Sequence, residues 1–227
     1  MFALFGSLID FLSEVIVFLY GFVPSYGLAI ILFTVLIRLL LLPLMIKQTK
    51  SMKAMQELQP KMQEIKDKYD DNKEKQQEEM MKLYQENNVN PLAGCLPLIV
   101  QMAIIIPLYR AILQLSETVP EFEDSVFLWI GRLTDGSLAE RDIALVILTG
   151  LVMLVQSKIT QSFSGGGGGK ASMMMWFMPI FIIFIGFQLP AAVMLYLFTS
   201  TIFMVFQQYY VKREPDEDEP ETAVQEA

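Results

Sequence analysis

The sequence predicts an all-α membrane protein with five transmembrane helices, an N-terminal interfacial helix and a cytoplasmic helical hairpin. Of its 227 residues, 53% are hydrophobic, and the mean hydropathy is +0.43. The apolar residues form blocks that carry almost no charge and are about 17 to 25 residues long, which is the length that a helix needs to cross a bilayer. Strongly polar sequence is concentrated in residues 47–90 and 212–227.

Residues 1–24 are predicted to form an amphipathic helix that lies in the membrane interface. Ser7, Asp10, Ser13 and Glu14 gather on one helical face, and apolar residues cover the rest. Each carboxylate would cost about 2.5–3.5 kcal/mol at the bilayer centre on insertion scales. We therefore favour the interface over a sixth spanning helix, which remains the alternative. The segment lacks the basic start of a secretory signal, so we expect no cleavage.

Five apolar segments follow, and basic residues set their orientation. The predicted spans are residues 25–46, 91–113, 138–159, 171–187 and 191–211. Lys47, Lys50 and Lys53 directly follow the first span, and basic clusters of this kind mark the cytoplasmic side. The N-terminus is then outside and the C-terminus is cytoplasmic.

Because successive spans cross the membrane in opposite directions, the segments between them are predicted to lie alternately outside and in the cytoplasm. Residues 114–137 form an acidic outer loop, in which Phe127, Leu128, Trp129 and Ile130 are predicted to form an interfacial patch. Residues 160–170 form a Gly-rich cytoplasmic loop, and residues 212–227 form an acidic, disordered cytoplasmic tail. Pro97 and Pro107 predict breaks in the second span.

Residues 47–90 are predicted to form the cytoplasmic hairpin. Apolar residues recur at helical spacing along both arms, and Pro60 should kink or restart the first arm. Asp70, Asp71 and Asn72 indicate the turn between the arms. The two seams are Met52, Met55, Met62, Ile65 and Tyr69 on the first arm, and Met80, Leu83, Tyr84 and Asn87 on the second.

Composition excludes several kinds of functional site. The chain has no histidine and one cysteine, Cys95, which excludes His-based catalysis, His metal ligands and an intramolecular disulfide. The net charge of −8 comes largely from the segment after Arg213, which holds seven acidic residues and no basic one. The low pI therefore describes a tail, and we predict no catalytic residue, no metal and no cofactor.

Arg38 is the most informative residue because it is a charge within the first span. An arginine stays protonated in proteins, and Arg38 is about 12 Å of helix from Ile46, too far for its side chain to reach the interface. It should face a wet cavity or a polar partner inside the bundle. The alternative is a structural arginine that caps carbonyl groups of a neighbouring helix.

Polar residues in other predicted spans are candidate companions of Arg38 in a hydrophilic site. Because no carboxylate lies deep in any span, a positive cavity without a fixed counter-ion would suit a transient anionic guest. For any single one of these residues, a helix–helix hydrogen bond remains the alternative. The candidates are Gln101 in the second span and Tyr196, Thr199, Ser200 and Thr201 in the last.

Four stretches, in family order, resemble the YidC family of membrane insertases. Residues 34–44 (TVLIRLLLLPL) resemble the first conserved span with its groove arginine, and residues 90–112 (NPLAGCLPLIVQMAIIIPLYRAI) resemble the second. Residues 58–91 resemble the cytoplasmic hairpin, and residues 189–211 (LPAAVMLYLFTSTIFMVFQQYYV) resemble the last span. Leu197 and Thr201 depart from the family pattern, which often has an aromatic residue and an asparagine there.

The resemblance implies a hydrophilic groove that is open to the cytoplasm and to lipid and closed to the outside. Arg38 then corresponds to the groove arginine, Gln101 to the groove glutamine, and Tyr196 to the Leu-Tyr motif of the last span. The implied function is a membrane protein insertase and chaperone that acts without ATP and is not an enzyme. It would accept polar segments of client proteins and release their apolar spans to lipid.

The resemblance also implies partners and a location. The partners are nascent membrane proteins and the lipid bilayer, with the ribosome and the Sec translocon as candidates and no small-molecule substrate. The location is the bacterial plasma membrane. The tail is acidic where the family's is often basic, so we do not expect it to dock on the ribosome. A small transporter or channel and a structural scaffold subunit remain the alternatives, although the spans show no inverted repeat.

Overall fold

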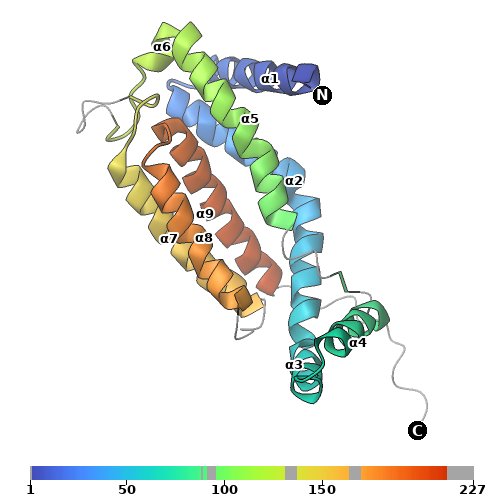
Figure 1. Cartoon of the computed structure of the whole chain (residues 1–227). Coiled ribbons are helices and arrows are strands. Elements are labelled where there is room, and N and C mark those ends of the chain that lie inside the picture. Colours follow the sequence, from blue (N-terminus) through green and yellow to red (C-terminus); the bar gives the residue numbers. More distant parts are fainter. Residues whose placement is uncertain (1, 88, 91–95, 131–136, 164–169, 214–227) are drawn as a thin grey trace.

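The computed structural model describes residues 2–87, 89–90, 96–130, 137–163 and 170–213, and these residues are largely helical (Figure 1). The side chains of residues 2–4, 97, 161–163, 170–176, 178 and 211–213 are outside the description. The helices are α1 (Phe2–Tyr20), α2 (Tyr26–Glu57), α3 (Gln59–Lys68), α4 (Lys73–Glu86), α5 (Leu96–Thr118), α6 (Pro120–Glu123), α7 (Ile143–Phe163), α8 (Lys170–Gly186) and α9 (Ala191–Arg213).

Five long helices form the body of the molecule. α9 packs against α2 and α7, α7 also packs against α8, and α5 contacts α9 (Figure 1). In the described part of the chain, α2, α5, α7 and α9 are long and apolar enough to cross a membrane. The other helix predicted as a span, α8, has 17 residues. The prediction of an all-α membrane fold is confirmed, and the exact number of spans remains a proposal.

The helices extend beyond the apolar segments that predicted them. The first span was expected to end at residue 46, but α2 continues to Glu57 because Gln48, Lys50 and the following residues are good helix formers. Ser25 caps its start by accepting a hydrogen bond from the Leu28 N–H at 3.3 Å. Pro60 lies in the first turn of α3, so it restarts the helix there, as its position predicts.

The expected break at Pro107 does not occur. Pro107 lies inside α5, which continues from Leu96 to Thr118. A proline removes one N–H from the helix ladder, and transmembrane helices tolerate that loss where neighbouring groups and small adjustments satisfy the freed carbonyl. Pro97 lies at the start of the same helix, where its missing N–H would be unpaired in any case. Neither proline therefore interrupts the span.

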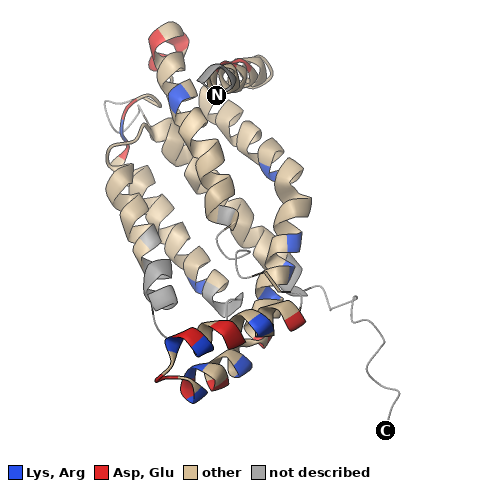
Figure 2. Ribbon diagram, turned by 45° about the vertical axis from the view of Figure 1, so that its right-hand side comes forward, with Lys and Arg blue, Asp and Glu red and all other residues tan. Residues whose placement is uncertain are grey.

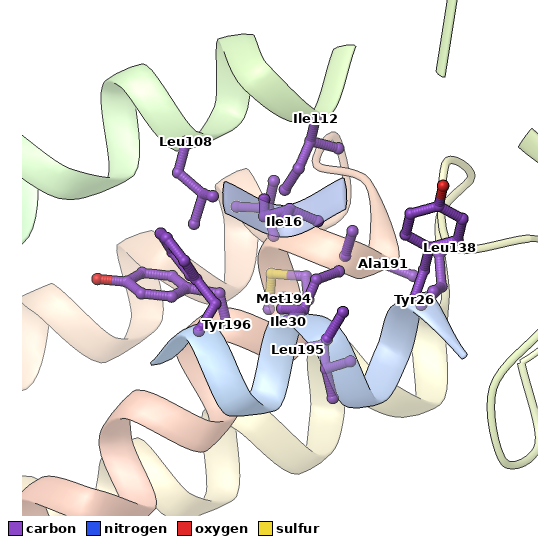
Figure 3. Close-up of a cluster of buried hydrophobic side chains, with 14 of the residues drawn as sticks. Ile16, Tyr26, Ile30, Leu108, Ile112, Leu138, Ala191, Met194, Leu195 and Tyr196 are labelled. Carbon is purple, nitrogen blue, oxygen red and sulfur yellow. The ribbon is translucent and has the colours of Figure 1, made fainter. Parts of the chain in front are cut away.

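The hydrophobic core occupies the end of the bundle at which α2 and α9 begin. Ile16 of α1, Ile30 of α2, Leu108 and Ile112 of α5 and Met194 of α9 meet there (Figure 3). The first residues of α9 are also held by the chain before α7, because the N–H groups of Ala191 and Ala192 donate to the carbonyls of Glu140 and Leu138. This end of the bundle is consequently dry and closely packed.

The loop after α5 closes this end, which corrects the prediction of an interfacial patch. Phe127 and Ile130 are buried in the core and exchange backbone hydrogen bonds across a tight turn, whereas Leu128 is 58% exposed at a positive φ of 55°. Phe122 of α6 is buried beside Tyr26. The turn places its first and last side chains in the core, exposes Leu128 and leaves Trp129 half-buried, so half of the expected patch becomes core. We call Phe122, Phe127 and Ile130 the outer plug, because the sequence predicts that residues 114–137 form an outer loop.

Gly27 makes the outer plug possible, and this predicts a large effect of a small substitution. A Cβ at Gly27 would lie 2.1 Å from the ring of Phe127 and 2.7 Å from its Cβ, so Gly27→Ala must displace the plug. Overpacking of this kind costs about 1–3 kcal/mol. We expect Gly27→Ala to lower the midpoint of thermal unfolding in detergent. Gly6→Ala in α1 is the matched control, since nothing lies within 4 Å of its added Cβ. Equal midpoints for both variants would contradict the packing account.

α1 lies across the end of the bundle and packs against α2 and α5 (Figure 1). Leu12, Ile16 and Leu19 form its buried face, and Asp10 accepts a hydrogen bond from Gln114 at 3.2 Å. The exposed surface carries Ser7, Asp10 and Glu14 beside the aromatic side chains of Phe11, Phe18 and Phe22. This division between acids and aromatic rings supports the interfacial placement, which remains a proposal.

α3 and α4 form a hairpin with a small core of its own. Leu58, Leu83 and Val89 are buried together, and Met55, Met62, Ile65 and Tyr84 from the predicted seams pack against them. Asn72 caps α4 by accepting from the Lys75 N–H at 3.0 Å. Lys82 lies 2.8 Å from Glu78 and 3.0 Å from Glu79, which raises the pKa of Lys82 and lowers that of Glu78. Charged residues are denser on this hairpin than on the spanning helices (Figure 2).

Parts of six predicted segments lie outside the described residues. These are residue 1 of the N-terminal helix, residue 88 of the hairpin, residues 91–95 of the second span, residues 131–136 of the outer loop, residues 164–169 of the Gly-rich loop and residues 214–227 of the acidic tail.

Candidate functional site

The candidate site is centred on Arg38, which is buried between α2, α5 and α9. Only 2% of the residue is exposed. Its Nε donates to the Ser200 hydroxyl at 2.9 Å, and its Nη2 donates to Gln101 Oε1 at 2.8 Å and also to Ser200 Oγ. Arg38 therefore has polar partners from two other helices, as expected of a charge that cannot reach the interface. These partners are side chains and not the backbone carbonyls of the structural alternative.

The site leaves the charge of Arg38 without a counter-ion. Ser200 and Gln101 are neutral, and no carboxylate of the described residues forms an ion pair with Arg38. Removing a guanidinium from water costs several kcal/mol, and hydrogen bonds to neutral acceptors offset only part of that cost. Packed apolar residues would be more stable at this position. The cluster therefore holds an uncompensated positive charge, which attracts an anionic or strongly hydrogen-bonding guest.

Tyr196 completes one wall of the cluster. It lies one helical turn before Ser200 on α9, is fully buried, and interacts electrostatically with Arg38. Its ring belongs to the apolar core, and its hydroxyl points away from the labelled core residues (Figure 3). That hydroxyl lies close to Ser200 and Gln101, the two hydrogen-bond partners of Arg38. Tyr196 thus marks the boundary between the dry core and the polar cluster.

The structure does not bring Thr199 and Thr201 into contact with Arg38. Successive residues of a helix point about 100° apart, so the neighbours of Ser200 face elsewhere. Thr201 is buried and donates its hydroxyl hydrogen bond to the carbonyl of Leu197 at 2.7 Å within α9. Thr199 is half-buried. Of the six predicted site residues, the structure gathers Arg38, Gln101, Tyr196 and Ser200.

Sequence reasoning missed a second set of buried polar residues nearer to the inner ends of the helices. Gln48 and Thr49 of α2 and Gln207 of α9 are each less than 10% exposed. The spacing held a usable signal, because Thr49 follows Arg38 by three helical turns and Gln207 follows Ser200 by about two. The basic residues around Gln48 obscured it, since they made residues after 46 read as hairpin.

The chemistry of the cluster suits transient binding. Arg38 supplies N–H donors only, Ser200 and Gln101 can change partners, and the plug and core separate the cluster from the outer end. Among the described residues, no group of three or more His, Cys, Asp or Glu side chains could hold a metal ion. The arrangement defines a class of protein: a multi-span helical membrane protein with a buried, positively charged hydrogen-bonding site.

Comparison with known proteins then gives the family. The model of the 60 kDa inner membrane protein family matches residues 18–218. The chain belongs to this family.

Curated relatives carry one shared description. The chain is 43% identical to membrane protein insertase YidC 2 of Bacillus anthracis over 84% of this chain and 73% of that protein. It is 44% identical to membrane protein insertase YidC of Oceanobacillus iheyensis, over 85% and 76%. It is 41% identical to membrane protein insertase MisCA of Bacillus subtilis, over 87% and 74%. The resemblance seen in the sequence is therefore confirmed.

A solved structure shows the same fold. The crystal structure described as an active YidC insertase with the first transmembrane domain resolved superposes with a TM-score of 0.70 at 32% identity. The match covers 92% of this chain and 46% of that one, so the present chain spans about half the length of that protein.

Proposed function

We propose that this chain is a membrane protein insertase and chaperone. Polar segments of client proteins enter the bundle from the inner side, and the cluster around Arg38 holds them while the client's apolar span moves into lipid. The observation that carries the proposal is a fully buried arginine bound only to neutral side chains, in a chain whose named relatives are insertases. A site of this kind lowers a barrier by offering hydrogen bonds where lipid offers none.

The proposal includes an orientation. The N-terminus and the outer plug lie outside, and the hairpin α3–α4 and the C-terminus lie in the cytoplasm. The basic residues Lys47, Lys50 and Lys53 on the inner stretch of α2 support this orientation. The location is the bacterial plasma membrane, and the partners are nascent membrane proteins and lipid. The ribosome and the Sec translocon are candidate partners, to be tested by adding each to a purified system.

Reconstitution tests the proposed function. Purified protein in liposomes without any other protein should insert a single-span client whose short polar tail must cross, and added protease should leave that tail protected. Empty liposomes are the control. The same liposomes should show no flux of ions or small solutes above the control. Flux without client protection would instead favour the channel or transporter.

A further inference from the structure

Gln207 on α9 is a buried polar residue that the site described above does not use. It is 9% exposed, and its side-chain carbonyl Oε1 is buried without a hydrogen-bond partner in the described part of the chain. Its neighbour Gln208 differs, because its amide exchanges hydrogen bonds with Thr160 of α7. A buried acceptor left unpaired is unfavourable, so its presence calls for an explanation.

The position of Gln207 relates it to the cluster around Arg38. Seven residues separate it from Ser200, which makes about two turns and about 10 Å of helix rise, so both side chains project from one face. Tyr196 lies on that face one turn to the other side of Ser200. The Tyr196 hydroxyl lies close to Ser200 and Gln101, whereas the Gln207 carbonyl is buried without a hydrogen-bond partner in the described residues. Buried polar groups therefore lie on both sides of the Arg38–Ser200 contact along one helix, and the one toward the end of α9 is unpaired.

The facing helix continues the same polar surface. α2 packs against α9, and both helices run from the outer plug toward the inner end. Thr49 follows Arg38 by three turns on the same face and is buried, and its hydroxyl donates to the Met45 carbonyl within α2 at 2.9 Å. Buried polar residues of α2 thus continue beyond Arg38 toward the inner end, from which a client segment would arrive.

We propose that Gln207 is a client-contact residue that a polar segment meets before it reaches Arg38. Its carbonyl oxygen accepts a hydrogen bond from a backbone N–H group of the segment, while Arg38 donates to backbone carbonyls and acidic side chains. The two residues are complementary, since a guanidinium has no acceptor and a client backbone carries both kinds of group. This inference rests on the proposed insertase function.

Gln207→Met separates this role from a structural one. A methionine of similar size removes the unpaired acceptor, so a purely structural view predicts unchanged or higher thermal stability and unchanged insertion. The client-contact role predicts an unchanged or higher unfolding midpoint together with an insertion rate about three- to tenfold lower, the loss of one hydrogen bond. Gln207→Glu keeps an acceptor oxygen and should retain at least half of the wild-type rate.

Gln208→Met is the matched control, because Gln208 is the same residue type one position along α9 and its side chain faces α7. It should insert clients at the wild-type rate. Insertion by Gln207→Met at the wild-type rate would overturn the inference, as would a loss accompanied by a lower unfolding midpoint that Gln207→Glu fails to restore. Wild-type protein in the same liposomes tests the proposed function itself. If the wild-type protein inserts no client, both proposals fail. If the wild-type protein inserts the client, the variants test the role of Gln207 alone.

Discussion

Replacing Arg38 is expected to lower the insertion of a client with an acidic translocated tail by about ten- to a hundredfold, the loss of one or two hydrogen bonds to a charged group. Arg38→Ala should impair a neutral-tailed client less, because only the acidic tail loses a charge attraction. Arg38→Lys should be intermediate for the acidic tail, since it keeps the charge and loses the fork that bonds Ser200 and Gln101 together. Arg38→Glu should be worst for acidic tails.

Stability measurements separate this expectation from a structural role. Arg38→Met fills much of the same volume without a charge. The desolvation cost that it removes offsets the hydrogen bonds that Ser200 and Gln101 lose, so the variant should stay close to the wild type in stability while it loses insertion. Arg110→Ala is the matched control, since Arg110 is an exposed arginine of α5 away from the cluster. Protein amount and unfolding midpoint are measured alongside insertion. Equal defects for acidic and neutral clients would contradict the electrostatic account.

Deletion of the hairpin is expected to abolish insertion and leave the bundle folded. Replacing residues 59–86 with a short flexible linker removes α3 and α4 with their separate small core. The main core and the Arg38 contacts involve other helices. The unfolding midpoint of the bundle should stay within a few degrees of wild type. The activity should fall to the level of empty liposomes, because the hairpin is the charged surface at the end from which clients arrive in the proposed orientation.

A milder change serves as the control for the deletion. Lys82→Ala removes two exposed ion pairs on α4 and should leave both stability and insertion close to wild type, since such pairs contribute little. A deletion variant that fails to accumulate in the membrane would show that the hairpin is a structural part of the bundle. A deletion variant that inserts clients normally would show that the hairpin has no part in function.

The fold class followed from the sequence because span length and charge distribution are physical requirements of a bilayer. Helix ends were harder to predict. The apolar sequence of the first span ends near residue 46, whereas the helix continues to Glu57, because the polar residues that follow are good helix formers. The outer turn was also misjudged. Phe127 and Ile130 have the composition of an interfacial patch. Only the turn that pairs them and packs Phe127 against Gly27 reveals them as core.

The part of the site that depends on a charged residue inside a span could be predicted from the sequence. Arg38 stood out because a span excludes charges, and its partners Gln101 and Ser200 lay among the few polar residues of other spans. Which residues near Ser200 face Arg38 depends on how α9 is rotated about its own axis. Thr199 and Thr201 were predicted as site residues without knowledge of that rotation. Gln207 escaped notice because glutamine near a span end usually reaches water. Its burial is a tertiary property that only packing reveals.

The most direct test of the account asks where a client's polar segment lies during insertion. A client is stalled by a bulky folded tail and carries one cysteine in its polar segment. Cys95→Ala removes the native thiol, and Ser200→Cys then places a thiol beside Arg38, while Phe184→Cys places one on the exposed surface of α8. We expect a disulfide between the stalled segment and residue 200 and none with residue 184. Crosslinking to residue 184 alone, or equally to both positions, would contradict the claim that the polar segment passes through the cluster around Arg38.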